Sequence, residues 1–218
     1  MSALAYKVHP YQWPVIGKEL SHVEKVQMQS AKDFFFKYYR PNNAVLVVAG
    51  NVKTDDIKVL AEKWFGEIPS GEAFTRNLPQ EPEQTEARLL EVKAEVPVDS
   101  IYIAYKMCER NHPDYYAIDL LRDILSTGDS SRLYHQLVKE RKLFSSVSAY
   151  TTETIDNGLL MVEAKLNKGV TMQEAQAAIE EVLQQVIDAQ VSEEELVKVK
   201  NKMESYLAFG KTNILNRA

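Results

Sequence analysis

The side chains that could hold a metal ion are few in this sequence and lie apart from one another. The four histidines are His9, His22, His112 and His135, and no two have the i, i+4 spacing that places paired zinc ligands on one helix face. No HxxEH or HxxE pattern occurs. Cys108, the only cysteine, lies four residues before His112, but a catalytic zinc normally needs a third protein ligand. We therefore expect no metal ligand in this chain.

The other candidates for catalysis are two serines and two groups of glutamates, and helix structure explains them better. Ser130 and Ser131 precede a helical pattern, so we expect their hydroxyls to cap that helix. Glu193–Glu195 and Glu180–Glu181 fall in first turns or on exposed faces, where carboxylates offset the helix dipole. No glycine-rich phosphate loop occurs. The sequence assigns no catalytic residue, and the substrate-binding residues stay unknown.

Composition limits the classes of partner. The chain has 218 residues, with 26 basic and 31 acidic side chains interspersed and a net charge of −5. A chain without a basic stripe is a poor match for a phosphate backbone, so we expect no nucleic-acid partner. No apolar run approaches the length of a transmembrane helix, and we expect a soluble chain cut from a longer protein.

The first part of the chain has the pattern helix, strand, helix. A capping box of Ser30 and Asp33 opens a helix that Pro41 must end, because proline lacks the backbone donor. Ala44–Ala49 is six apolar residues long and predicts a core strand. Thr54 is the expected cap of a second helix, which has an apolar stripe and closes at Gly66.

The second part follows a polar, proline-containing linker over residues 77–87. Its patterns predict a hairpin-like pair of strands, two helices, a second hairpin around Asp156–Gly158 and two more helices. The expected elements are strands at Leu90–Val96, Ile101–Tyr105, Leu143–Tyr150 and Leu159–Leu166, and helices at Ala117–Leu125, Leu133–Val138, after Thr171 and after Ser192. The predicted fold class is two-layer α+β, with helices packed on one face of a mixed or antiparallel sheet.

Short motifs occur along nearly the whole chain in one order. They are His9–Tyr11, Pro14–Gly17, Tyr39–Ala44, Val47–Gly50 and Trp64–Pro69, then Ser131–Tyr134, Lys139–Glu140, Ser146–Ser148, Asp156–Gly158 and Glu194–Leu196. In this order they resemble the pitrilysin/insulinase-like zinc metallopeptidases, a family that includes the mitochondrial processing peptidases and related bacterial zinc proteases.

The resemblance implies a division of the chain and a place for the zinc. In that family each half-molecule has two similar α+β domains, and an HxxEH helix with a downstream glutamate binds zinc in the first. Residues 1–76 would then be the C-terminal part of the zinc-bearing domain, residues 77–87 the linker, and residues 88–218 a truncated second domain. The zinc ligands of the parent protein would lie upstream of His9, where the HxxEH glutamate would deprotonate a zinc-bound water.

The family also implies a substrate-binding pair that this sequence lacks. Many relatives carry an arginine and, seven residues later, a tyrosine that help to hold the peptide opposite the zinc. The matching positions here are Val138 and Ser145. This fits a zinc-bearing half whose partner half supplies the pair, and it also fits an inactive half.

Three functions follow as hypotheses. The first is the non-catalytic, structural segment of a zinc metalloendopeptidase that cleaves peptides or small unfolded proteins in a chamber closed by a second half-molecule. The second is a partner or assembly subunit that kept the fold and lost the metal site. The third is a module that binds peptides by adding a strand to a sheet edge. The compartment is left open between bacterial periplasm and cytoplasm.

Overall fold

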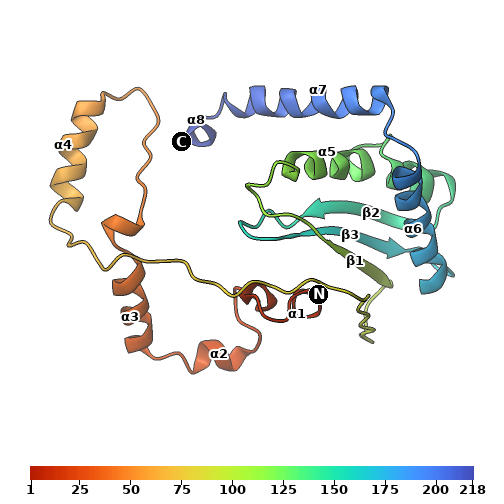
Figure 1. Cartoon of the computed structure of the whole chain (residues 1–218), viewed down its shortest axis with the longest axis horizontal. Coiled ribbons are helices and arrows are strands. Elements are labelled where there is room, and N and C mark those ends of the chain that lie inside the picture. The colour runs from red at the N-terminus through yellow and green to blue at the C-terminus, as the bar shows by residue number, and fades with distance from the viewer. The chain divides into compact units, whose positions relative to one another are not determined.

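The structure is a computed structural model that describes all 218 residues, and it divides into two compact units (Figure 1). One unit, called the sheet unit here, comprises Glu91–Tyr206 together with Met1. The other, called the helical unit, comprises Ser2–Leu90 and Leu207–Ala218. No helix combines the length and the apolar content that a membrane crossing requires.

The sheet unit is built on three antiparallel strands in the order β1-β3-β2. Strand β1 spans Ser100–Lys106, β2 spans Phe144–Thr151 and β3 spans Leu159–Leu166. Strands β2 and β3 form a hairpin, so both strands predicted on either side of Asp156–Gly158 are confirmed. The β-branched and alternating apolar residues of these segments explain why they form strands.

Three helices of the sheet unit pack on one face of the sheet. They are α5 (Tyr115–Ser126), the π-helix η3 (Tyr134–Glu140) and α6 (Met172–Asp188). The buried cluster between the layers takes its side chains from all of these elements: Leu125, Leu133, Leu137, Phe144, Val147, Ala149, Val162, Ala164, Leu166, Ala175, Ala178, Ile179 and Val182. The two-layer α+β class predicted from the sequence is confirmed.

A β-bulge at Ser145 sets which side chains of β2 face this core. Phe144 pairs with Leu166 and Ser146 pairs with Lys165, so one extra residue lies between the two pairs. Side chains alternate along a regular strand, and Phe144 and Val147 would then point to opposite faces. The extra residue lets both of them enter the core, where they are buried.

The first predicted strand of the second domain is wrong. Residues 90–96 carry no strand hydrogen bonding, and Leu90 and Val92 are 61% and 72% exposed. Only the segment after the Pro97–Asp99 turn forms a strand, and it pairs with β3 instead. Alternation tells which residues of a strand share a face, but it does not identify the neighbour that would pair with it.

In the sheet unit, two of the predicted helix caps are confirmed and one is wrong. Thr171 Oγ1 accepts from the backbone N–H of Glu174 at the start of α6, and Ser192 forms a reciprocal capping box with Glu195 at the start of α7 (Glu193–Gly210). Ser131, by contrast, is buried with a hydroxyl that has no hydrogen-bond partner, and the Ser130 hydroxyl accepts from Lys198 Nζ. The buried Ser131 side chain therefore makes no capping hydrogen bond.

The helical unit consists of short helices joined by extended chain (Figure 1). Its elements are α1 (Ser2–Ala5), η1 (Pro10–Gln12), α2 (Leu20–Glu24), α3 (Met28–Tyr38), η2 (Pro41–Asn43), α4 (Thr54–Phe65) and α8 (Ile214–Arg217). Helix α3 ends before Pro41, and α4 ends next to Gly66, as predicted. The predicted N-caps are wrong, because α3 starts earlier, after Gln27, and α4 is preceded by Lys53 without a side-chain cap.

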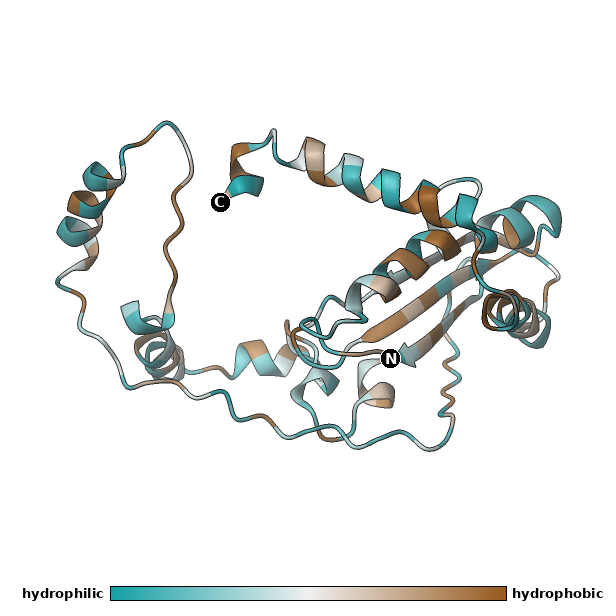
Figure 2. Cartoon of the chain, turned by 45° about the horizontal axis from the view of Figure 1, so that its top comes forward, coloured by the Kyte–Doolittle hydropathy of each residue, from teal (hydrophilic) through white to brown (hydrophobic).

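The predicted core strand at Ala44–Ala49 is also wrong. The segment is extended but pairs with no strand, and Val45 is 89% exposed. The apolar stripe of α4 is likewise uncovered, with Trp64 67% exposed. Figure 2 shows apolar residues along this extended chain and along the helix. An apolar run predicts burial, but the described residues contain no layer that covers this one.

Lys142 closes the helix that contains η3 in a conformation that favours glycine. The N–H of Leu143 donates to the carbonyl of Leu137, six residues back, and Lys142 between them has a φ of 54°. As in a Schellman motif, a left-handed residue ends the helix, although the bond here spans one residue more, and Leu137 and Leu143 both lie in the core. A side chain in this left-handed region is strained by about 1 kcal/mol relative to glycine.

Replacing Lys142 with glycine should therefore raise the free energy of unfolding by about 0.5–1 kcal/mol, since the strain relieved exceeds the added freedom of the unfolded chain. Denaturant unfolding followed by circular dichroism measures the change. Lys202→Gly, in an ordinary position of α7, is the matched control and should lower stability by about 1 kcal/mol. Equal destabilisation by both variants would contradict the assignment of strain to Lys142.

Candidate functional site

Each of the four histidines has a local contact. His9 is buried, and its Nδ1 accepts from the N–H of Tyr11, capping η1. His22 Nδ1 accepts from the N–H of Lys18, His112 Nδ1 lies 3.6 Å from Asp114, and His135 Nδ1 lies 3.5 Å from Glu140. No group of three or more His, Cys, Asp or Glu side chains could hold a metal ion. The donor set of this chain therefore does not fit a zinc site.

The loop that contains His9 is held by a carboxylate from the predicted linker. Glu81 accepts hydrogen bonds from the backbone N–H groups of Lys7, Val8 and His9, at 2.7, 2.8 and 2.9 Å. Arg88 Nη1 donates to the carbonyls of Leu4 and Ala5. Burial, with Tyr11 and Glu81 nearby, raises the pKa of Tyr6 to about 12. These contacts explain the His9–Tyr11 motif as a loop anchor rather than a reactive group.

The turn after α3 shows what the two asparagines of the Pro41–Asn43 motif do. Asn43 Nδ2 donates to the carbonyl of Tyr38, and Arg40 Nε donates to the carbonyl of Phe36, so two open carbonyls of the last helical turn are satisfied. The Asn42 side chain both donates to and accepts from the backbone of Gly71, each at 3.0 Å. The sequence predicts a turn here but not its partner 29 residues away.

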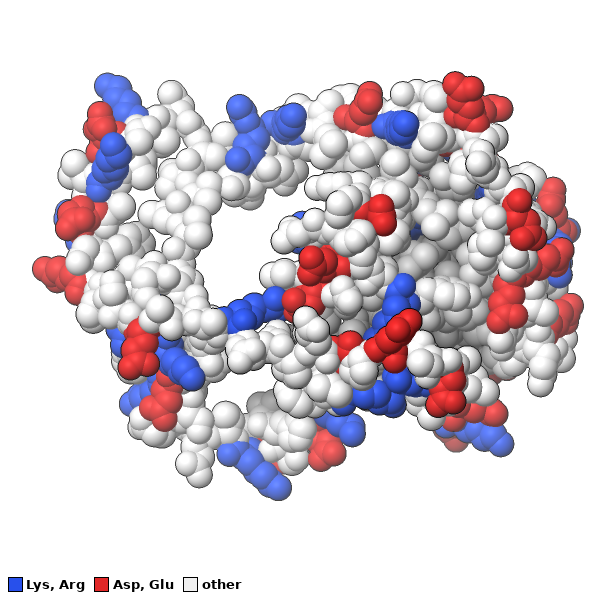
Figure 3. All heavy atoms as spheres, viewed as in Figure 1, with Lys and Arg blue, Asp and Glu red and all other residues white.

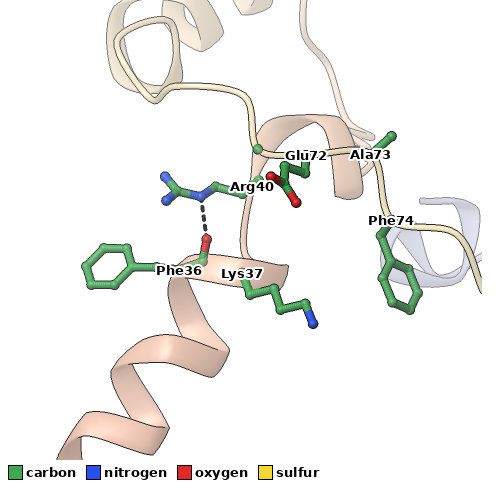
Figure 4. A pocket seen from close by; sticks show the side chains of 7 residues that line it. Phe36, Lys37, Arg40, Glu72, Ala73 and Phe74 are labelled. Carbon is green, nitrogen blue, oxygen red and sulfur yellow. Dashed lines mark hydrogen bonds between the residues drawn. The ribbon is translucent and has the colours of Figure 1, made fainter.

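A hollow of about 290 Å³ lies beside this turn (Figure 4). It is lined by Phe36, Lys37, Arg40, Gly71, Glu72, Ala73 and Phe74. Figure 4 shows the Arg40 side chain directed back to the carbonyl of Phe36, at the end of α3. Two cations, one carboxylate and two rings could hold a side chain, and the lining contains no serine, threonine, cysteine or histidine.

The positions that match the family's substrate-binding pair have structural roles here. Val138 packs, half-buried, against the core cluster of the sheet unit. Ser145 is the exposed residue of the β2 bulge, and its hydroxyl donates to the carbonyl of Lys165. Neither side chain carries a charge or a ring. The pair is therefore replaced by one packing residue and one bulge residue.

The best-formed polar contact in the sheet unit joins Arg132 to Glu195. Arg132 Nε and Nη2 donate to the two carboxylate oxygens, each at 2.8 Å, and both side chains are mostly buried. The hydrogen bonds from Arg132, with those from Ser192, lower the pKa of Glu195 from 4.5 to about 2. We call this contact the Arg132–Glu195 pair. It joins the start of the η3 helix to the capping box of α7.

Two carboxylates that the sequence does not single out lie together on α5. Asp119 and Asp123 flank Arg122, at 3.1 and 3.2 Å, and Asp123 also accepts from the Thr127 hydroxyl. Burial raises the pKa of Asp119. Their spacing of four residues on a helix could have revealed the pair. The shared arginine accounts for both as an ion-pair network, so they do not form an acid/base pair.

Acidic and basic side chains are interspersed over the face shown in Figure 3. No continuous basic field runs along it, in agreement with the composition. This face offers no continuous basic track for a phosphate backbone.

The sequence matches the family described as Peptidase M16 inactive domain over residues 25–203. The chain belongs to this family. The M16 chain is 29% identical over 199 residues to the zinc protease PqqE of Helicobacter pylori, covering 90% of this chain and 45% of that protein. It is 27% identical over 207 residues to the uncharacterized zinc protease YmxG of Bacillus subtilis, covering 95% of this chain and 49% of that protein.

Solved structures agree with this placement. The M16 chain superposes on a protease from Helicobacter pylori with a TM-score of 0.87 and 26% identity, covering 97% of this chain and 52% of that one. A peptidase M16 inactive domain from Pseudomonas fluorescens has the same fold, with a TM-score of 0.82 at 21% identity. The M16 chain spans about half the length of the curated relatives it matches. The predicted resemblance to this peptidase family is confirmed.

Proposed function

We propose that the M16 chain is the structural, non-catalytic segment of a zinc-dependent metalloendopeptidase. The observation that carries the proposal is the match of 90% of the chain to less than half of a zinc protease, combined with a donor set that does not fit zinc. The parent protein cleaves peptides or small unfolded proteins in a chamber closed by a second half-molecule. This segment forms part of the chamber wall, and zinc binds to residues outside the sequence given.

The proposal includes a division into two domains. Residues 1–76 form the C-terminal part of the zinc-bearing domain, residues 77–87 the linker, and residues 88–218 the second domain. The exposed apolar residues of the helical unit support this division, because a surface of this kind marks a contact with another layer. They include Phe34, Phe35, Val45, Leu46, Val47, Trp64 and Phe65.

A second candidate is a partner subunit that kept the fold and lost the metal site. The replacement of the substrate-binding pair by Val138 and Ser145 is compatible with it, and equally with a zinc-bearing half whose partner half supplies the pair. The two candidate functions predict different sequences upstream of the 218 residues. A catalytic parent carries an HxxEH helix before this sequence, and a partner subunit lacks one or more of its ligands.

An activity measurement tests the proposal. The 218-residue chain and the same chain extended upstream along its reading frame are incubated with an unstructured, internally quenched peptide. We expect cleavage only by the extended protein, and a metal chelator should abolish it because the reaction depends on zinc. Cleavage by the 218-residue chain alone would contradict the proposal. An inert extended protein without an intact HxxEH helix would favour the partner subunit.

A further inference from the structure

Three side chains meet on the face of the sheet opposite the core cluster. Tyr102 of β1 pairs directly with Glu163 of β3, and Glu163 pairs with Ser148 of β2. Tyr150 lies two residues further along β2, diagonal to Glu163 on the same face. The Tyr102 hydroxyl donates to Glu163 Oε1 at 3.1 Å. We call Tyr102, Glu163 and Tyr150 the sheet-face cradle.

The cradle is open to solvent on one side. The same face is buried at Met161, which is 4% exposed, whereas Tyr102 and Tyr150 are 48% and 38% exposed. Beyond the cradle the face continues with the exposed Ser146, Ser148 and Lys165. This face is therefore apolar and buried at Met161, and polar and exposed at the serines and Lys165.

The charge of the cradle is not balanced within the chain. Glu163 is half-buried and accepts a hydrogen bond from Tyr102, but it forms no ion pair. The hydrogen bond to Glu163 raises the pKa of Tyr102, and burial together with the nearby Glu163 raises that of Tyr150. Lys165, on the same face, is exposed and lies outside ion-pair distance of Glu163. The carboxylate therefore has room for a cation.

Two tyrosine rings beside a carboxylate form a surface that favours an organic cation. A lysine or arginine side chain can lie against a tyrosine ring through its charge and its aliphatic stem, while its head pairs with the carboxylate. The serine hydroxyls next to the cradle can hydrogen-bond to the backbone of an extended chain. A small inorganic cation would leave the rings and hydroxyls unused.

We propose that the sheet-face cradle binds a lysine or arginine side chain of an extended peptide that lies across the open face of the sheet. The peptide class rests on the proposed peptidase function, and the choice of a basic side chain rests on the cradle itself. Binding across a face also differs from strand addition at an edge, since it depends on Glu163 and not on the free backbone groups of β1.

Peptide binding to the complete 218-residue chain tests the proposal. The probes are two fluorescein-labelled ten-residue peptides of glycine, serine and alanine, one with a central arginine and one with citrulline, which has the same shape without the charge. Fluorescence anisotropy should show about three- to tenfold tighter binding of the arginine peptide, as expected for a half-buried charge-assisted contact. Glu163→Gln should remove this preference, and Tyr102→Phe should reduce it about two- to threefold.

Glu204→Gln is the matched control, because it removes the same charge from an exposed position of α7 and should leave the preference unchanged. Both cradle variants keep the shape of the side chain, and circular dichroism checks that they fold. Equal binding of the two peptides by the wild-type chain, including no binding of either, would overturn the proposal. A preference that survives Glu163→Gln would also overturn it, because another acidic side chain would then recognise the charge.

The result is separable from that of the cleavage experiment. If the 218-residue chain prefers the arginine peptide while the extended protein is inert, the cradle proposal is supported and the proposed peptidase function is contradicted. If the extended protein is active while the 218-residue chain binds both peptides equally, the proposed peptidase function is supported and the cradle proposal is contradicted.

Discussion

Replacing Phe144 with alanine should lower the free energy of unfolding of the sheet unit by about 3–5 kcal/mol, the cost of removing a buried ring and leaving a cavity. Phe144 is 1% exposed and lies in the cluster that joins β2 to the helices. It is held there by the bulge at Ser145, which lets Phe144 and Val147 share the core face. Denaturant unfolding followed by circular dichroism measures the change.

Tyr206→Ala provides the matched control for this prediction. Its ring is 73% exposed at the end of α7, so its loss should change the free energy of unfolding by less than about 0.5 kcal/mol. A similar effect of both substitutions would show that Phe144 is not a core residue.

Replacing Glu195 with glutamine should destabilise the sheet unit at neutral pH by about 1–2 kcal/mol, because Arg132 loses its carboxylate partner. The estimate is below the full value of the pKa shift, since the carboxylate is partly exposed and screened by solvent. Glutamine can still complete the capping box with Ser192, so the loss reports on the Arg132–Glu195 pair.

The pH dependence of this effect has a defined sign. The pKa of Glu195 is lowered in the folded protein from 4.5 to about 2, so its contribution is complete above pH 4.5 and is lost as the pH falls toward 2. The stability difference between wild type and Glu195→Gln should shrink over that range in chemical denaturation. Glu194→Gln removes a charge from the same helical turn without a partner and should change stability little at any pH. A difference that stays constant down to pH 2 would contradict the assignment.

The elements predictable from the sequence are those whose signals are local. The strand Leu159–Leu166 follows from its apolar residues and the preceding Asp156–Gly158 turn, and the Ser192–Glu195 box lies within four residues. The resemblance to the peptidase family is also confirmed, and it could be predicted because it depends on the order of short motifs along the chain.

The features that sequence reasoning missed depend on residues far apart in the chain, or on a residue type that is unusual for its backbone conformation. The Arg132–Glu195 pair joins residues 63 positions apart, and the sheet-face cradle exists only because the register sets Tyr102 opposite Glu163. Lys142 occupies a position where glycine is the usual signal. The apolar run Ala44–Ala49 predicts a buried strand correctly only if another layer covers it, and local patterns carry no information about that layer.

The most direct test of the central claim is the zinc content of two purified proteins, the 218-residue chain and the chain extended upstream along its reading frame. Metal analysis by inductively coupled plasma mass spectrometry should find about one zinc ion per extended chain and less than about 0.1 zinc ion per 218-residue chain. The reason is that a catalytic zinc needs about three protein ligands, and the 218-residue chain brings no such group together. Stoichiometric, tightly held zinc in the 218-residue chain would contradict the account.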